Sequence, residues 1–176
     1  MSVFAQLNDA ATKKGLRFLV IGGHAVIEHG FQRGTEDADI LVCKEQRADW
    51  MGLAEGLGYK LFHDGGTFIQ FEPTDPSEWN LDVMLVPAET FTRLFQAAKP
   101  ANLEGAQVVV PSLEHLLTLK IHALKHSKGL RVLKDMTDVA QLLSINRVDP
   151  KAAWVKELFE KHGNVENYER VIRLLT

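Results

Sequence analysis

The feature that most constrains this chain is a change in its hydrophobic pattern near Pro111. Before this residue, short apolar runs alternate with turns that contain glycine and aspartate, which is typical of strands joined to short helices. After it, apolar residues recur every three or four positions, as in amphipathic helices. The 176-residue chain is therefore predicted to have an α/β (α+β) fold, with a small mixed β-sheet core at 1–110 and a helical C-terminal part at 111–176 packed on that core.

The limits of the predicted elements follow from the glycine, proline and capping residues between the apolar runs. Strands are predicted at 17–21, 38–43, 59–62, 67–71, 79–86 and 107–110. Helices are predicted at 2–14, 24–29, 46–56, 113–127, 131–144, 151–161 and 165–175. Asp64-Gly65-Gly66 predicts a hairpin turn between two of these strands.

Composition excludes several classes of protein. Hydrophobic residues make up 45% of the chain and charged residues 24%, as in ordinary globular proteins. No apolar run approaches the roughly 18 residues of a membrane span, and the N-terminus lacks the pattern of a secretory signal. The single cysteine, Cys43, cannot form an internal disulfide. We therefore expect a cytoplasmic protein with no membrane partner.

The charge is distributed unevenly along the chain, although the net formal charge is only −3. Residues 35–89 carry 12 acidic side chains and three basic ones. Residues 113–134 carry five basic side chains and one acidic one. An acidic half beside a basic segment suits a site for a divalent metal and a polyanion, and it equally suits two solvated faces of opposite sign.

Three aspartates lie in strand-like surroundings. Asp37 and Asp39 are two residues apart at the start of an apolar run, so on a strand they share one face. Asp82 lies inside the run Leu81–Val86. If the two strands are neighbours, the three carboxylates predict a site for Mg²⁺ or Mn²⁺, ions that prefer oxygen ligands. A solvated turn at 37–39 and an outward-facing Asp82 are the alternatives.

The segment before these acids contains groups that can bind phosphate. Gly22 and Gly23 follow a predicted strand and precede a predicted helix, where backbone N–H groups can face an anion. Arg33 and Thr35 could add a guanidinium and a hydroxyl group. A tight strand-to-helix turn and two loop residues are the structural alternatives.

The order of these residues resembles the nucleotidyltransferase superfamily related to DNA polymerase beta. Gly22-Gly23, then Asp37-Ala38-Asp39-Ile40, then a strand bearing Asp82 follow the superfamily pattern. Arg33-Gly-Thr35-Glu-Asp37-Ala-Asp39 looks closest to the small bacterial branch that includes AbiE-type toxins. Lys120 and Lys134-Asp135-Met-Thr-Asp138 are similar to that branch's lysine and K-D-x-x-D pattern.

This resemblance implies an enzyme that transfers NMP from an NTP to an acceptor and releases pyrophosphate. Asp37, Asp39 and Asp82 would be the catalytic and metal-binding residues. NTP would be bound through Gly22, Gly23, Arg33, Thr35 and Lys120. An RNA such as a tRNA 3′ end would be the acceptor, and a cognate antitoxin would be a further partner.

Other interpretations stay open at this stage. The acceptor could be a small hydroxyl compound or a protein side chain, and an inactive nucleotide-binding or partner-binding module is a further alternative. Lys120 lies at the edge of the apolar face of 113–127, where it could reach solvent or point toward a phosphate. Arg131 with Asp135, and Lys134 with Asp138, are predicted to pair on the helix surface at a spacing of four residues.

Overall fold

The structure is a computed structural model that describes residues 2–176. The chain forms two compact units. The sheet unit contains the residues up to Ala25 and Gly34–Ser112, and the helical unit contains Val26–Arg33 and Leu113–Thr176. The predicted α/β class, with a mixed sheet and C-terminal helices, is confirmed. No helix within the described residues is both long and apolar enough to cross a bilayer.

The main sheet has the strand order β1-β2-β5-β4-β3. Its strands are β1 (Leu19–Val20), β2 (Asp37–Cys43), β3 (Tyr59–Asp64), β4 (Phe68–Pro73) and β5 (Asn80–Val86). β2 and β5 are parallel, and the other neighbouring pairs are antiparallel. The two strands that carry the predicted acids are therefore direct neighbours within the sheet.

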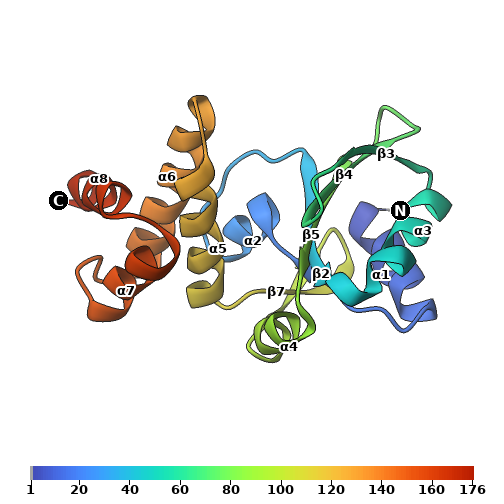
Figure 1. Cartoon of the computed structure of the whole chain (residues 1–176), viewed down its shortest axis with the longest axis horizontal. Helices are drawn as coiled ribbons and strands as arrows, with labels where there is room; N and C mark the ends of the chain where they lie inside the picture. The colour runs from blue at the N-terminus through green and yellow to red at the C-terminus, as the bar shows by residue number, and fades with distance from the viewer. Residues whose placement is uncertain (1) are drawn as a thin grey trace. The chain divides into compact units, whose positions relative to one another are not determined.

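Alternating residues divide this sheet into a buried apolar face and a more polar face. Ala38, Ile40 and Val42 of β2 are wholly buried and face equally apolar residues of β5. Helices α1 (Val3–Lys13) and α3 (Arg47–Gly56) lie on one side of the sheet (Figure 1). Their buried side chains, which include Phe4 and Trp50, complete the core of this unit. The aspartates of β2 and β5 occupy the alternate positions, which project from the other face of the sheet.

The described part of the sheet unit contains three elements that were not predicted from the sequence. Helix α4 (Ala88–Gln96) follows β5, and strand β6 (Lys99–Leu103) pairs with β7 (Ala106–Val110) in a separate hairpin. A short 3₁₀ helix, η1 (Lys44–Gln46), joins β2 to α3. β7 packs against α1 and β1, so the hairpin is held to the N-terminal elements of its own unit.

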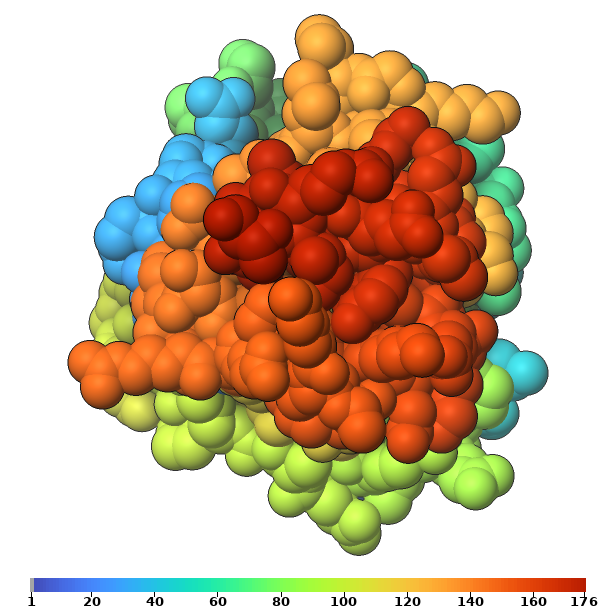
Figure 2. All heavy atoms as spheres, turned by 90° about the vertical axis from the view of Figure 1, so that its left-hand side faces the viewer, coloured from blue at the N-terminus to red at the C-terminus, as the bar shows by residue number. Residues whose placement is uncertain are grey.

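The helical unit is built from α5 (Leu113–His126), α6 (Leu130–Ile145), α7 (Ala153–His162) and α8 (Val165–Leu175). All four helices lie close to their predicted positions. α5 contacts α6 and α7, while α8 contacts α6 and α7. Figure 2 shows α7 and α8 side by side at the surface of this unit.

Residues 26–33 belong to the helical unit although they lie early in the sequence. Asn146 donates a hydrogen bond from Nδ2 to the carbonyl oxygen of His29 at 3.0 Å. A Cβ on Gly30 would lie only 2.9 Å from Cγ2 of Ile145, so the backbone at Gly30 packs directly against the end of α6. These contacts attach the early segment to the late helices.

Candidate active site

The three predicted aspartates lie on one face of the sheet. Asp39 and Asp82 are register partners on the parallel strands β2 and β5, and Asp37 precedes Asp39 by two residues. Side chains at such positions project from the same face. All three are partly exposed, whereas their strand neighbours Ala38 and Leu81 are buried. The parallel pairing thus brings together acids that are 43 positions apart in sequence, Asp39 and Asp82.

Gln70 adds a polar side chain to this face. It lies on β4 directly opposite Asp82. Its Nε2 is 3.2 Å from Oδ1 and 3.4 Å from Oδ2 of Asp82, so the amide donates to that carboxylate. Gln70 was not among the site residues predicted from the sequence. The signal available was its position between buried Ile69 and Phe71, which places it on the polar side of its strand.

The turn after β1 is in direct contact with Asp39. The backbone N–H of Ile21 donates to the carbonyl oxygen of Asp39 at 2.9 Å. Gly22 has φ of +60°, a conformation that L side chains rarely adopt. A Cβ at this position would lie 1.9 Å from Oδ2 of Asp39. Gly22 is therefore required both by its backbone conformation and by the space that the carboxylate occupies.

The helix after this turn begins earlier than predicted. The predicted helix covered 24–29 with Gly22 and Gly23 before it, but α2 spans Gly22–Glu28. The backbone N–H of Ala25 already donates to the carbonyl oxygen of Ile21 at 3.3 Å, so helical hydrogen bonding begins at the Gly22 turn, where φ is positive. Gly23 is buried at the second position of α2.

An aromatic cluster supports the same turn. His24 is 8% exposed, and its ring stacks on Trp79 with the ring centroids 4.9 Å apart. Phe4 meets the His24 ring edge-on at 4.8 Å. Because Trp79 immediately precedes β5, this packing links the start of α2 to the strand that carries Asp82.

The aspartates offer oxygen donors of the kind that a divalent metal ion prefers. Asp39 and Asp82 supply carboxylate oxygens from directly opposite positions, and Asp37 supplies a third carboxylate on the same face. Mg²⁺ is commonly held by one or two protein carboxylates and completes its coordination with water and substrate phosphates. Among residues 2–176, no three His, Cys, Asp or Glu side chains are gathered closely enough to hold a metal ion. These carboxylates alone do not form a metal site, so a cation here would need further ligands such as phosphate oxygens.

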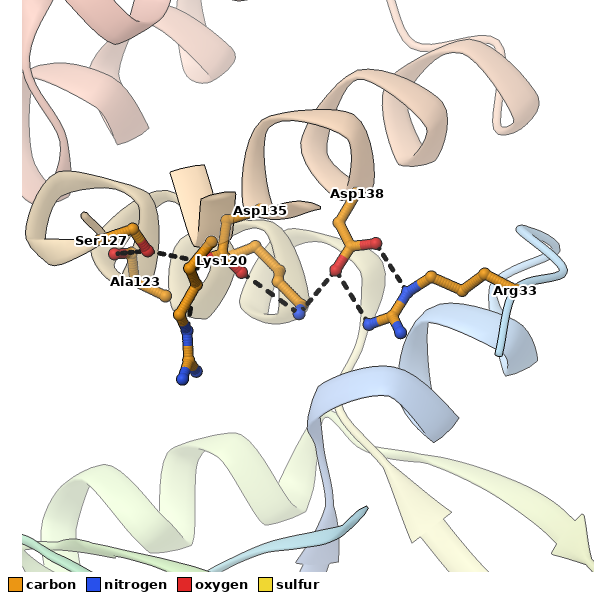
Figure 3. Close-up of polar contacts among 7 residues, drawn as sticks. Arg33, Lys120, Ala123, Ser127, Asp135 and Asp138 are labelled. Carbon is orange, nitrogen blue, oxygen red and sulfur yellow. Dashed lines mark hydrogen bonds and ion pairs between the residues drawn. The ribbon is translucent and has the colours of Figure 1, made fainter. Parts of the chain in front are cut away.

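Two predicted phosphate ligands, Arg33 and Lys120, meet in the helical unit at one carboxylate, Asp138 (Figure 3). Arg33 binds it through Nε at 2.8 Å and Nη2 at 3.1 Å. Nζ of Lys120 lies 2.7 Å from the same carboxylate. Thr35 belongs to the sheet unit and lies, partly exposed, two residues before β2.

One predicted ion pair is wrong and one is confirmed. Lys134 is exposed, and Asp138 contacts Arg33 and Lys120 instead. Asp138 is wholly buried on the inner face of α6, which a spacing of four residues does not reveal. Arg131 does pair with Asp135, at 3.7 Å.

Solved structures share this architecture. The antibiotic-resistance factor ANT(2″)-Ia is similar with a TM-score of 0.68 at 17% identity, over 96% of this chain and 92% of that chain. Its complex with adenylyl-2″-tobramycin gives 0.64 at 16% identity, over 90% and 95%. The lincosamide antibiotic adenylyltransferase LnuA, lincomycin-bound, gives 0.57 at 18% identity, over 79% and 93%. The chain has the nucleotidyltransferase fold.

The nucleotidyltransferase fold agrees with the superfamily resemblance seen in the sequence. At the level of sequence, no protein-family model and no curated protein matches the chain. The similarity to the AbiE-type branch stays a prediction. The assignment of individual site residues therefore depends on their geometry in this chain.

Proposed function

We propose that this protein is a nucleotidyltransferase that moves the NMP part of an NTP to an acceptor hydroxyl group and releases pyrophosphate. The supporting observation is the pairing of Asp39 with Asp82 on adjacent parallel strands, with Gly22 closed against Asp39. The fold is shared with an adenylyltransferase, which supports the proposal.

The reaction forms one bond and breaks one bond. The acceptor oxygen bonds to the α-phosphorus, and the bond from that phosphorus to the bridging oxygen of pyrophosphate breaks. We assign Asp82 as the base that takes the proton of the acceptor hydroxyl. Gln70 would orient the Asp82 carboxylate through the hydrogen bonds already formed.

We assign Asp37, Asp39 and Asp82 as the carboxylates that would hold Mg²⁺ or Mn²⁺ together with the phosphates of the NTP, since the three side chains alone are not gathered closely enough to do so. When bound, such an ion neutralises negative charge that the phosphoryl oxygens develop in the transition state. The chain's own part is to present the carboxylates on one face of a rigid sheet, at the register fixed by β2 and β5.

The remaining predicted ligands are assigned to the phosphates of the NTP. The backbone N–H groups of Gly22 and Gly23 and the hydroxyl of Thr35 would donate hydrogen bonds. Arg33 and Lys120 would supply positive charge. These groups match the chemistry of a triphosphate, which offers only acceptors and negative charge.

We propose a small hydroxyl compound as the acceptor. ANT(2″)-Ia is described in complex with adenylyl-2″-tobramycin and LnuA with lincomycin, and this chain covers more than nine-tenths of each. The acid-rich segment 35–89 adds a charge argument, because it favours a cationic acceptor over a polyanion.

An RNA acceptor in a cytoplasmic toxin–antitoxin system is the second candidate. It is supported by the basic segment 113–134. In the structure, however, Lys120 is buried against Asp135 and Asp138, while Lys125 and Lys128 are exposed. Because Lys120 is assigned above to the NTP, fewer cations of this segment remain for an RNA backbone than the sequence count indicates.

The test is label transfer from each α-³²P-labelled NTP with Mg²⁺ or Mn²⁺. One set of reactions contains aminoglycoside and lincosamide antibiotics, and another contains total bacterial RNA. The control is the doubly substituted Asp37→Ala/Asp39→Ala protein, which should transfer no label.

The outcomes separate the candidates. Label on an antibiotic with the intact protein supports the proposal, and label on RNA supports the second candidate. Metal-dependent NTP binding without label on either would direct the search to protein acceptors. An intact protein that neither binds NTP nor transfers label would contradict the proposed function and favour an inactive binding module.

A further inference from the structure

The helical unit contains a buried network of charged side chains that the proposed reaction does not use in full. Asp138 is wholly buried, and Asp135 is 3% exposed (Figure 3). Asp135 accepts a short hydrogen bond from the Ser127 hydroxyl, and Lys120 Nζ lies 3.8 Å away. Arg131 reaches Asp135 from the surface. Buried carboxylates are rare unless they are paired, so their roles require an explanation.

Asp138 is the centre of this network. Both of its oxygens accept from Arg33 in a forked arrangement, and one of them also faces Lys120 Nζ. Two cations therefore share one carboxylate. The arrangement fixes their separation as well as their direction, because a guanidinium fork and an ammonium must approach different parts of the same group.

Lys120 keeps hydrogen-bonding capacity in this position. An ammonium group has three N–H donors. Asp138 is within hydrogen-bond distance, whereas Asp135 Oδ1 at 3.8 Å is not. The Lys120 side chain is 11% exposed and that of Arg33 is 13% exposed. The cations are thus held by a buried acid while part of each side chain reaches the surface.

We infer that Asp138 is a positioning residue that sets Arg33 and Lys120 as a pair for binding a polyphosphate. The inference deepens the proposed function and rests on it, since the polyphosphate would be the triphosphate of the NTP. Asp135 has a secondary role, because of the two cations Arg33 and Lys120 it approaches only Lys120.

A purely electrostatic role for Asp138 predicts the opposite change in anion affinity. If Asp138 only neutralised the two cations, removing its charge would strengthen the binding of an anion. If Asp138 positions them, replacing one carboxylate oxygen with an amide NH₂ would turn a donor toward a cation and release it. The anion would then bind more weakly although the net charge had become more positive.

The test measures binding of tripolyphosphate by calorimetry to Asp138→Asn and to the intact protein, without metal. Affinity for Asp138→Asn should fall by about tenfold, as for loss of a charged hydrogen bond. In the transfer assay, KM for NTP should rise by a similar factor while kcat changes less than about threefold. Glu160→Gln is the matched control, because it neutralises an exposed acid that pairs with Lys156 in the same unit, and its affinity should not fall.

Unchanged or stronger binding by a folded Asp138→Asn protein would overturn the inference and leave the proposed function intact. An intact protein that binds no tripolyphosphate would also overturn it, and an absence of both binding and transfer would contradict both ideas. If Asp138→Asn does not fold, Asp135→Asn replaces it. A loss of about threefold in affinity is then expected, because this change affects only the longer of the contacts that position Lys120 and leaves Arg33 on Asp138. A gain in affinity would contradict the inference.

Discussion

Aspartates in the two units are held in different ways. Asp39 and Asp82 are partly exposed on a sheet face, where Gly22 closes against one and the neutral amide of Gln70 donates to the other. Asp138 is wholly buried and accepts hydrogen bonds from two cationic side chains. One side-chain type therefore has two environments within a single chain.

The difference in burial and partners indicates two different roles for these aspartates. Carboxylates placed by backbone register and left partly accessible can receive a ligand from solution. A buried carboxylate that is already satisfied by cations can only orient those cations, because a second ligand would have to displace them. Burial and partners, rather than the residue type, thus separate the proposed catalytic acids from the proposed positioning acid.

The largest effect is expected from Asp39→Asn. We expect label transfer to fall by a factor of about 10³ or more, because the amide removes negative charge from the proposed metal site. Mn²⁺ binding measured by calorimetry should be lost and thermal unfolding should change little. Glu72→Gln, an exposed change on β4, is the control. If label transfer by Asp39→Asn stays within tenfold of that by the intact protein, Asp39 is not a catalytic acid. The proposed difference between the catalytic aspartates and the positioning aspartate would then be contradicted.

Gly22→Ala tests whether the backbone sets the position of Asp39. Gly15 and Gly22 have similar φ values, +65° and +60°, but only Gly22 has atoms within 4 Å of the added Cβ. Gly15→Ala should cost about 1 kcal/mol of unfolding free energy from backbone strain, and Gly22→Ala about 3 kcal/mol with loss of transfer. Urea unfolding measures both. Equal losses of unfolding free energy in the two variants would show that the contact of the added Cβ with Asp39 does not affect stability.

Tyr59 provides a buried polar group without the cation pairing seen at Asp138. Burial, with Glu78 nearby, raises the pKa of Tyr59 to about 12. The unfolded chain loses this proton near its ordinary pKa of 10, so the native state holds more protons between these values. The contribution of Tyr59 to the free energy of unfolding should therefore be fully present below pH 10. It should fall by at most about 2.7 kcal/mol as the pH rises to 12. Denaturant unfolding across this range checks it.

The control for this pH effect is Tyr59→Phe. It removes the titrating group together with the hydrogen bond to the carbonyl oxygen of Trp79. The slope of stability against pH between 10 and 12 should become shallower in this variant. An unchanged slope would assign the effect to other groups.

The smallest effect is expected from Arg131→Met at the surface end of the aspartate network. The Arg131 side chain is 71% exposed, and its contact with Asp135 is 3.7 Å long. Solvent screening should limit the loss to about 0.3–0.5 kcal/mol of unfolding free energy. Thermal unfolding checks this value. A loss above about 2 kcal/mol would show that the surface pair supports the buried carboxylates directly.

Local sequence patterns predicted most of the elements. The four C-terminal helices and strands β2 and β5 lie near their predicted limits, since strong apolar periodicity and clear breaks define them. Helix α4 was missed although Phe91 and Leu94 are buried at helical spacing. Strand β6 was missed because Pro100 lies inside it and proline is uncommon in strands.

The partners of the candidate site residues were less predictable. The contact of Gln70 with Asp82 depends on the register of β4 against β5, which no local sequence pattern predicts. The pairing of Arg33 with Asp138 joins positions 105 residues apart. Periodicity placed Lys120 at the edge of its helix face, but the acid that meets it comes from another helix. Contacts of this kind depend on the packing of whole elements.

The early segment 26–33 also has a consequence for the order of folding. Its partners lie far along the chain, with His29 and Asn146 separated by 117 positions. During synthesis, these residues leave the ribosome long before α5 and α6 exist. The closure of so long a loop carries a large entropic cost and slows folding. The helical unit is therefore expected to assemble only after most of the chain has been translated, with Gly30 and Arg33 docking as its late step.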